Sequence, residues 1–417
     1  MKKTVLIVCI IVLALLISGG SILSGLRANA APQPSATEAP LPSPSPAATP
    51  SPTPVPTLTP PVTLPNGMSV DRSAEKLDLS SLKKDELKET AEDLKELDNL
   101  KYVILGSEDK ENKNSLTLED AGYLQELFPN IDFDYSFTFY DKEINTLDTE
   151  LDLNHIKMTD EGQAVREILP YMKKCTFVNM DMCNVSSDAM GLIRDENPDK
   201  EVVWRVFFGN DCAIRTDAER ILASNLNHGL TSNNTKNLKY CTKIKYLDIG
   251  HQWVDDISFL SYMPDLEVCI IGVNMPWTDL SPISNCKKLE YLEMEDTSCR
   301  DISALKGLTN LKHLNIVGLG EITGYESLLT LDSIERLWIG GSTKVPQEIV
   351  DEIQALHPDC EINTTALAAI KGHWQVEPNG GYVPRYALLR QQFEYSDYGH
   401  SCSSIKNDKR YYSYDLQ

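Results

Sequence analysis

The stretch IKYLDI at residues 244–249 decides the fold, because its spacing of apolar residues recurs four more times before residue 340. In each copy, two apolar residues stand three positions apart and a third follows two positions later. Successive copies begin 22, 23, 22 and 23 residues apart. This alternation predicts one short strand with a buried face in every copy. The five apolar triplets are Ile244/Leu247/Ile249, Leu266/Cys269/Ile271, Leu289/Leu292/Met294, Leu311/Leu314/Ile316 and Ile334/Leu337/Ile339.

A second shared element follows the strand by roughly a dozen residues, as Asp256-Ile257-Ser258, Asp279-Leu280-Ser281 and Asp301-Ile302-Ser303. A strand and a turn repeated at this period are the pattern of a leucine-rich repeat. The sequence therefore predicts an α/β solenoid, a horseshoe whose parallel sheet lines the concave face. The 27 residues from Leu151 to Val178 leave room for a helix on the convex side, whereas 22 or 23 leave room only for turns or 3-10 segments.

The chain divides by composition into six segments. Residues 1–30 form a signal peptide or N-terminal membrane anchor, and residues 31–65 form a Pro/Ser/Thr-rich disordered stalk. Residues 66–240 carry irregular, helix-containing repeats, and residues 241–345 carry the regular array. Residues 346–365 form a last helix–strand repeat, and residues 366–417 form an aromatic-rich cap or tail, because the open end of a solenoid must be covered.

The N-terminal segment predicts export. Lys2 and Lys3 precede an apolar run from Val5 to Ile17, and Ala28-Asn29-Ala30 follows as a cleavage site. Extended to Leu26, the apolar stretch also has about the length of a membrane span, so an uncleaved anchor stays an alternative. The 13 prolines between Pro32 and Pro65 favour an extended stalk or a plain linker. We expect a secreted or cell-surface protein.

The strong negative charge argues against nucleic acid as a partner. The chain carries a formal charge of −22, and cleavage after Ala30 would remove three basic and no acidic residues, which gives −25. Phosphate binding depends on Lys and Arg, and the sequence has no basic stripe. Anionic membrane surfaces are disfavoured for the same reason. The sequence does not define an oligomeric state.

Three predicted helices end in the same way and bracket the regular array. Each runs into a residue pair Pro129-Asn130, Pro198-Asp199 or Pro358-Asp359 and then into a strand. The first two strands are followed by similar tails, Ile144-Asn145-Thr146 and Ile214-Arg215-Thr216. This recurrence predicts an internal duplication.

The regular array resembles the repeats of internalin-type bacterial surface proteins, with residues 301–308 (DISALKGL) as the closest segment. The longer repeats resemble those of secreted leucine-rich repeat proteins of anaerobic Gram-positive bacteria. This resemblance implies binding of another macromolecule, a protein or glycan, through the concave sheet. The ladder residue of that family, usually Asn, is present as Asn274, whereas Gln252, Thr297 and Leu319 replace it elsewhere. No immunoglobulin-like module or LPxTG-type sorting signal supports covalent surface attachment.

Residues between the buried strand positions are predicted to point outward on the concave face. Aromatic and Arg side chains at such positions typically anchor interfaces. The first outward column is Tyr246, Val268, Tyr291, His313 and Arg336, and the second is Asp248, Ile270, Glu293, Asn315 and Trp338. A third outward column, Gly250, Gly272, Glu295, Val317 and Gly340, is mostly small and would let a partner approach the backbone. The candidate ligand-binding residues are those of the first two columns without Val268, namely Tyr246, Asp248, Ile270, Tyr291, Glu293, His313, Asn315, Arg336 and Trp338.

Two alternatives to partner binding stay open. The C-terminal tail could fold across the concave face and bury its aromatic residues, as in a structural or sensory envelope ectodomain. Glu293 and Glu295, about 6.5 to 7 Å apart on one strand, could form the acid pair of a carbohydrate hydrolase, although solvated surface charge is the expected state of both. His251 and His313 are expected to be surface histidines. We predict no catalytic residue, no metal and no cofactor.

The cysteines of the regular array are predicted to be buried apolar residues, because Cys241, Cys269, Cys286 and Cys299 occupy slots that other copies fill with aliphatic side chains. Cys241 and Cys286 stand two coils apart, about 10 Å, which is too far for a disulfide. The spacing leaves pairing among the remaining cysteines open, namely Cys175, Cys183, Cys212, Cys360 and Cys402.

Overall fold

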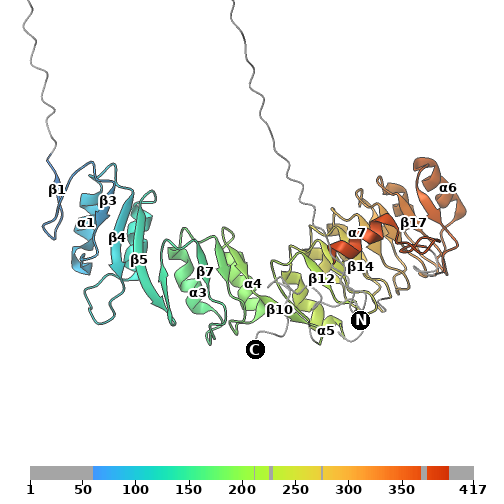
Figure 1. Ribbon diagram of the computed structural model, residues 1–417, viewed down its shortest axis with the longest axis horizontal. Helices are drawn as coiled ribbons and strands as arrows, with labels where there is room; N and C mark the ends of the chain where they lie inside the picture. Colours follow the sequence, from blue (N-terminus) through green and yellow to red (C-terminus); the bar gives the residue numbers. More distant parts are fainter. Residues whose placement is uncertain (1–59, 211, 225–228, 274–275, 368–372, 394–417) are drawn as a thin grey trace, which may run out of the picture. The chain divides into compact units, whose positions relative to one another are not determined.

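A computed structural model describes residues 60–210, 212–224, 229–273, 276–367 and 373–393 (Figure 1). The chain divides into two units, Met1–Leu58 and Thr59–Gln417, and every described residue lies in the second. The predicted signal peptide and most of the predicted stalk lie outside the described residues, as do Asn274 and Cys402. No described helix has the length and apolar character that crossing a bilayer requires.

The folded unit begins before the predicted end of the stalk. Strand β1 (Val62–Thr63) pairs antiparallel with β2 (Ser69–Val70), and a turn closes where Gly67 N–H donates to the Leu64 carbonyl at 2.8 Å. Val62 and Leu64 are buried in the main core. The prediction that the stalk runs to residue 65 is therefore wrong, because these two apolar residues form the first layer of the solenoid.

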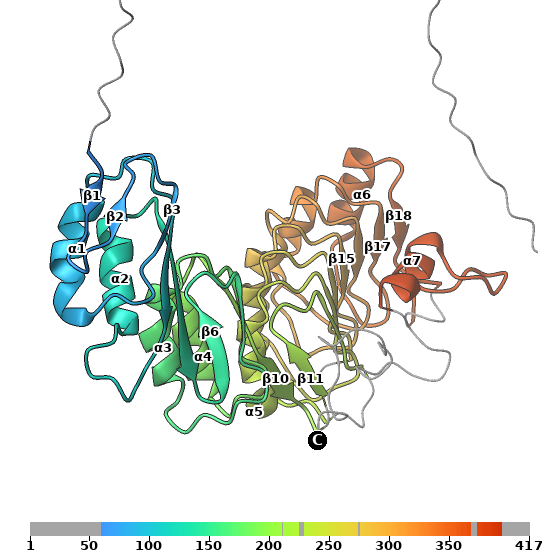
Figure 2. The same ribbon diagram turned by 60° about the vertical axis from the view of Figure 1, so that its left-hand side comes forward.

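The N-terminal half consists of two sheets with helices along one side (Figures 1 and 2). The first sheet joins three parallel strands and one antiparallel strand: β3 (Lys76–Asp78), β4 (Tyr102–Ser107), β5 (Asp132–Phe139) and β6 (Lys142–Asn145). Its helices are η1 (Lys84–Glu86), α1 (Leu87–Leu94) and α2 (Leu118–Leu127). The second sheet is parallel, with strands β7 (Glu150–Asp152), β8 (Phe177–Asn179) and β9 (Glu201–Val203). Its helices are α3 (Gln163–Ile168), η2 (Leu169–Tyr171) and α4 (Ser187–Glu196).

Two β-hairpins interrupt the solenoid and support the predicted duplication. One is β5–β6, and the other joins β10 (Arg205–Phe208) to β11 (Cys212–Arg215). Thr146 follows the first hairpin, donates its backbone N–H to the Tyr135 carbonyl, and accepts the Tyr135 N–H at its hydroxyl. Thr216 follows the second and makes the same two bonds with Trp204. A new parallel sheet starts after each threonine.

The regular array forms one parallel sheet of seven strands, two more than the five recognised copies. The added strands lie at the two edges, and the register runs through all seven without a shift. The strands are β12 (Arg220–Leu222), β13 (Tyr246–Asp248), β14 (Val268–Ile270), β15 (Tyr291–Glu293), β16 (His313–Asn315), β17 (Arg336–Trp338) and β18 (Glu361–Asn363). The opposite side carries α5 (Ser232–Thr235), η4 (Lys236–Tyr240), η5 (Ser258–Tyr262), η6 (Ser281–Asn285), η7 (Ser303–Leu305), η8 (Tyr325–Thr330) and α6 (Gln347–Leu356).

The recurring Asp-x-Ser element starts the 3-10 segments. The Asp256 carboxylate accepts the Ser258 N–H at 2.8 Å, and Asp279 and Asp301 hold Ser281 and Ser303 in the same way. These bonds satisfy N–H groups that the start of a helix leaves without a partner. The apolar residue between each pair is buried. In each Asp-x-Ser element, the Asp thus stabilises the start of the 3-10 segment and the middle residue holds it against the core.

Side chains that bridge neighbouring coils form only a partial ladder. Gln252 accepts the Leu230 N–H and donates to the Ala223 carbonyl, each at 3.0 Å. Leu319 has no such group, and Thr343 of the next coil accepts its N–H at 2.9 Å. The turn hydrogen bonds therefore differ from one coil to the next where the ladder residue is replaced.

The described cysteines are all buried, and Cys241, Cys269, Cys286 and Cys299 of the regular array are free thiols, which confirms the prediction for these four. Cys175, Cys183 and Cys360 are free thiols as well. Burial raises the pKa of the Cys241 thiol to about 12, so the thiol is neutral at physiological pH. These residues act as small core side chains.

Candidate functional site

The outward-facing residues of the seven-stranded sheet stand in the predicted columns. The strand register aligns Tyr246, Val268, Tyr291, His313 and Arg336 in one row. The neighbouring row holds Asp248, Ile270, Glu293, Asn315 and Trp338. We refer to this side of the sheet as the concave face.

The concave face is covered by residues 373–393 of the same chain, here named the C-terminal segment. It contains a narrow turn, where Val383 N–H donates to the Gln375 carbonyl at 3.1 Å, and then helix α7 (Pro384–Gln392). Figure 2 shows α7 and α6 on opposite sides of strands β17 and β18. The expectation of an exposed face is therefore wrong, and the alternative of a self-covered face describes the structure. Apolar side chains of both parts form one cluster: Leu222, Val268, Ile270, Tyr291, Val317, Trp338, Ala366, Trp374, Val383, Tyr386, Leu389 and Phe393.

Trp374 occupies the centre of this cluster. Its indole is 1 % exposed, and its ring centroid lies 5.4 Å from that of Tyr291 and 5.3 Å from that of Trp338. The His313 ring stands edge-on at 6.1 Å. The indole Nε1–H donates to Glu293 Oε1 at 2.7 Å. Three aromatic rings and one acceptor thus surround a side chain from outside the sheet.

Arg336 holds the backbone next to Trp374. Its two terminal nitrogens donate to the carbonyls of His373 and Trp374 at 2.7 and 2.8 Å. Its Nε donates to Glu361 at 2.8 Å, and its guanidinium lies 4.2 Å from the centroid of the Trp338 ring. A rigid guanidinium fork is suited to binding two adjacent acceptors. Arg336 therefore binds the main chain of the C-terminal segment rather than its side chains.

Glu293 is a buried acid at the floor of the cluster. It is 3 % exposed and accepts hydrogen bonds from the Tyr291 hydroxyl and the Trp374 indole. Burial, reinforced by the charge of Glu295, raises the pKa of Glu293 to about 8. The expectation of two solvated carboxylates is wrong for Glu293, because Trp374 excludes water from it. A sugar cannot reach this acid while the C-terminal segment is in place.

The remaining candidate residues have smaller contacts with the segment. Asp248 and Asn315 are buried, and each accepts a backbone N–H two residues ahead, which stabilises the strand end. His313 is half-buried rather than on the surface, and burial lowers its pKa to about 4. His251 is exposed, as expected.

The other end of the segment contacts strands β12 and β13. The Phe393 ring stands 6.1 Å from the Tyr246 ring, and Arg220 donates to the Gln392 carbonyl at 2.7 Å. At the opposite end of the cover, the carbonyl of Ala366 lies where Gly340 has no side chain, and a Cβ there would be 2.1 Å from that oxygen. The small residue at position 340 thus admits the chain that leads into the segment.

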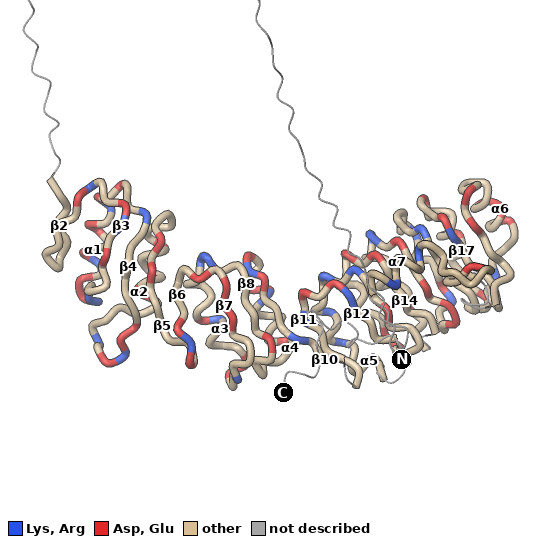
Figure 3. Tube along the Cα trace, viewed as in Figure 1, with Lys and Arg blue, Asp and Glu red and all other residues tan. Residues whose placement is uncertain are grey.

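A cavity of about 520 Å³ opens along the edge of α7. Its walls come from the starts of strands β15 to β18 and from the segment itself, including Lys312, Glu335, Glu361, Arg385 and Leu388. Basic and acidic residues both line this cavity, and Figure 3 shows the two kinds interspersed over the described chain. The cavity thus borders the covered face along α7.

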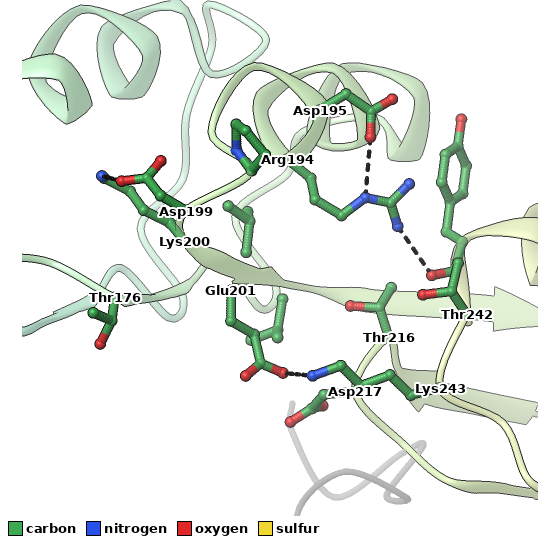
Figure 4. Close-up of a pocket in the computed structure, with 14 residues that line it drawn as sticks. Thr176, Arg194, Asp195, Asp199, Lys200, Glu201, Thr216, Asp217, Thr242 and Lys243 are labelled. Carbon is green, nitrogen blue, oxygen red and sulfur yellow. Dashed lines mark hydrogen bonds and ion pairs between the residues drawn. The ribbon is translucent and has the colours of Figure 1, made fainter. Parts of the chain in front are cut away.

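A second cavity of about 640 Å³ lies where the second N-terminal sheet meets the regular array (Figure 4). Its charged residues are engaged with one another. Arg194 contacts Asp195, Lys200 contacts Asp199, and Lys243 contacts Glu201. The fourth acid of the lining, Asp217, contacts Arg215 outside the cavity. Each acid is thus paired with a basic residue, which leaves no unpaired charge pattern that would select an ion. Among the described residues, no group of three or more His, Cys, Asp or Glu is placed to hold a metal.

The sequence predicts a tail over the concave face only as an alternative, and it does not identify the residues that contact the sheet. Trp374, Tyr386, Leu389 and Phe393 lie in the segment that is predicted as an aromatic-rich cap or tail. Their signal is present, because Pro384 marks a helix start and the apolar positions 386, 389 and 393 share one helical face. The contacting residue Arg220 was missed because strand β12 lies before the first recognised copy.

The stacked coils, the single parallel sheet and the buried apolar triplets define a leucine-rich repeat solenoid. No family model matches the sequence, and no curated protein matches it. Similar solved structures include the internalin InlF of Listeria monocytogenes, at 17% identity over 67% of this chain and 60% of that chain, with a TM-score of 0.26. A leucine-rich repeat protein of Leptospira interrogans is 14% identical over 65% of this chain and 74% of its own, with a TM-score of 0.30. InlJ of Listeria monocytogenes is 15% identical over 68% and 59%, with a TM-score of 0.28. The chain thus spans 60% of the length of InlF.

Proposed function

We propose that this chain is a non-catalytic binding protein that recognises a protein partner through the concave face, and that the C-terminal segment closes this face until the partner displaces it. One observation carries the proposal. The outward positions of β14, β15 and β17 hold large apolar and aromatic side chains, and a polypeptide segment from outside the repeats buries them. Such residues typically anchor interfaces between proteins.

A protein fits this face better than a glycan, because its contacts suit a polypeptide. Arg336 binds main-chain carbonyls, and the cluster accepts the apolar side of a helix. Helix-in-groove docking is a common mode of peptide recognition. Binding of a glycan instead is an outcome that the experiment below would reveal.

The setting of this function is outside the cytoplasm. The charged, apolar and small-residue regions of residues 1–30 support export. The absence of catalysis is supported by Glu293, because the acid that could serve a hydrolase is sealed beneath Trp374 and hydrogen-bonded there. The hydrogen bonds that Glu293 accepts come from Tyr291 and Trp374 of the same chain.

A second candidate function is a purely structural ectodomain in which the C-terminal segment never leaves the sheet. The completeness of burial favours it, since Trp374, Leu389 and Phe393 are as buried as the core of the array. The two candidates differ in one respect. Only the binding protein opens without unfolding.

Arrays of cell-surface proteins and glycans, probed with the full-length chain, test the proposed function. We expect Trp374→Ala to bind a protein on the array at least tenfold more tightly than the wild type, because its concave face opens more readily. Adding Tyr291→Ala should abolish that binding, and Trp253→Ala, which changes a tryptophan that is 68 % exposed elsewhere, should not. The proposal would be contradicted if Tyr291→Ala left the binding unchanged, or if the array yielded a glycan and no protein.

A further inference from the structure

The cluster around Trp374 has the form of a side-chain pocket. The Tyr291, Trp338 and His313 rings surround a flat bicyclic ring, and Glu293 accepts its single N–H. Phenylalanine has no N–H to donate, and its ring is smaller. The pocket therefore matches a tryptophan side chain in both ring size and hydrogen bonding, whereas phenylalanine would leave Glu293 without this donor.

Arg336 adds a contact that is independent of the sequence of the ligand. It donates to the carbonyl of Trp374 and to that of the preceding residue, and every peptide with a tryptophan offers the same pair of carbonyls. Its guanidinium is held in place by Glu361 and by the face of the Trp338 ring. Arg336 is thus oriented by the sheet and by ring stacking.

The rest of the face accepts a short amphipathic helix. Helix α7 turns Tyr386 and Leu389 toward the sheet, and Phe393 follows in the same line against Tyr246. These positions stand three and four residues apart, which is the spacing of the apolar side of a helix. Leu388, on another side of α7, is exposed.

The occupant is tethered to its site. Strand β18 ends at Asn363, and Trp374 follows eleven positions later. A short tether gives an effective concentration of about millimolar order. A segment of modest intrinsic affinity therefore fills the site most of the time, and a partner of higher affinity can exchange with it.

We propose that the concave face is a recognition site for a peptide that presents a tryptophan followed by a short amphipathic helix, and that residues 373–393 are its resident, exchangeable occupant. This inference rests on the function proposed above, because it names the class of ligand for the same face. The partner is a protein whose binding segment carries these two features.

A labelled synthetic peptide with the sequence of residues 373–393 tests the inference on the full-length chain. We expect Trp374→Ala, whose own segment has lost its anchor, to bind the peptide at least tenfold more tightly than the wild type. A peptide in which the tryptophan is replaced by alanine should bind at least tenfold more weakly. Combining Trp374→Ala with Trp338→Ala should remove binding, whereas combining it with Trp253→Ala should not.

The inference is overturned if folded Trp374→Ala binds the peptide no better than the wild type, or binds both peptides equally. Phe393→Ala loosens the other end of the segment and replaces Trp374→Ala if that variant does not fold. Failure of both variants to fold would also overturn it, because the segment would then be an integral part of the array. If the peptide test fails but the array yields a protein whose binding requires Tyr291, the proposed function stands. Only the proposed class of ligand is then excluded.

Discussion

The charged forms of Glu293 and His313 both oppose closure of the concave face, and the two residues act in opposite directions with pH. Burial raises the pKa of Glu293 from its ordinary 4.5 to about 8 and lowers that of His313 from 6.5 to about 4. Because burial is the largest cause of both shifts, we expect both pKa values to return toward normal when the C-terminal segment leaves and water enters. The groups that face Glu293 are Tyr291, Glu295, Asp248, Trp374, Gln375 and Tyr386, and those that face His313 are Arg385, Arg336, Lys312, Glu335, Tyr291 and Trp374.

These shifts predict weaker closure at alkaline pH. The contribution of Glu293 is complete below about pH 4.5 and is lost as the pH rises to about 8. The contribution of His313 is complete above about pH 6.5 and is lost as the pH falls to about 4. The two offset each other between pH 4.5 and 6.5, so the net change falls between pH 6.5 and 8. Since one pKa unit is about 1.4 kcal/mol, closure should weaken by about 2 kcal/mol there.

Trypsin cleavage after Arg385 and Arg390, measured relative to cleavage of the free 373–393 peptide, checks this prediction. The relative rate in the wild type should rise at least tenfold from pH 6.5 to 8. Glu293→Gln should remove most of that rise, because glutamine keeps an acceptor for Trp374 and has no charge to bury. A relative rate that is equal at both pH values would contradict the account of Glu293.

For single residues, the sequence predicts the place of a side chain on a strand better than its exposure to solvent. The columns from Tyr246 to Arg336 and from Asp248 to Trp338 follow from the period of two residues in a strand. That Tyr291 and Trp338 are buried does not follow, because burial depends on Trp374, which is distant in sequence and belongs to no repeat. The raised pKa of Glu293 has the same origin.

The elements follow local signals with few exceptions. The three helices before Pro129, Pro198 and Pro358 are α2, α4 and α6. Helix α3 begins at Gln163, because the residue before it, Gly162, has a left-handed backbone with φ +76 that a helix cannot include. The short strands and 3-10 segments of the array follow from the 22- to 23-residue period. The sequence does not predict the two hairpins, but it shows strands followed by similar tails at both places.

The duplicated threonine after each hairpin should stabilise the fold measurably. Thr146→Val should lower the free energy of unfolding by about 1–3 kcal/mol, because valine has the shape of threonine and leaves the Tyr135 N–H without its acceptor. Thr216→Val should act in the same direction through Trp204. Urea titration followed by circular dichroism measures both effects.

The exposed Thr138 of strand β5 provides the matched control. Thr138→Val should change the free energy of unfolding by less than about 0.5 kcal/mol. If Thr146→Val is as stable as Thr138→Val, the threonine contacts do not hold the hairpin, and the duplication has no structural role at this position.

For the whole molecule, the sequence predicts an α/β solenoid, a binding face and a tail that could cover it. It cannot choose between an open and a covered face, because that choice depends on packing between the sheet and a segment without repeats. The structure has the covered arrangement and assigns the cover to residues 373–393. Of the predicted C-terminal cap or tail, residues 373–393 cover the concave face, and residues 394–417 lie outside the described residues.

Hydrogen exchange of the intact chain, read by mass spectrometry, tests most directly whether the C-terminal segment opens without unfolding of the array. The account predicts that amides of α7, such as those of Ala387 and Phe393, exchange at least tenfold faster than those of β15 and β16, after correction for intrinsic rates. Trp374→Ala should accelerate exchange in α7 further and leave β15 and β16 unchanged. Equal protection of α7 and these strands, in both proteins, would contradict an exchangeable cover and favour a permanent structural one.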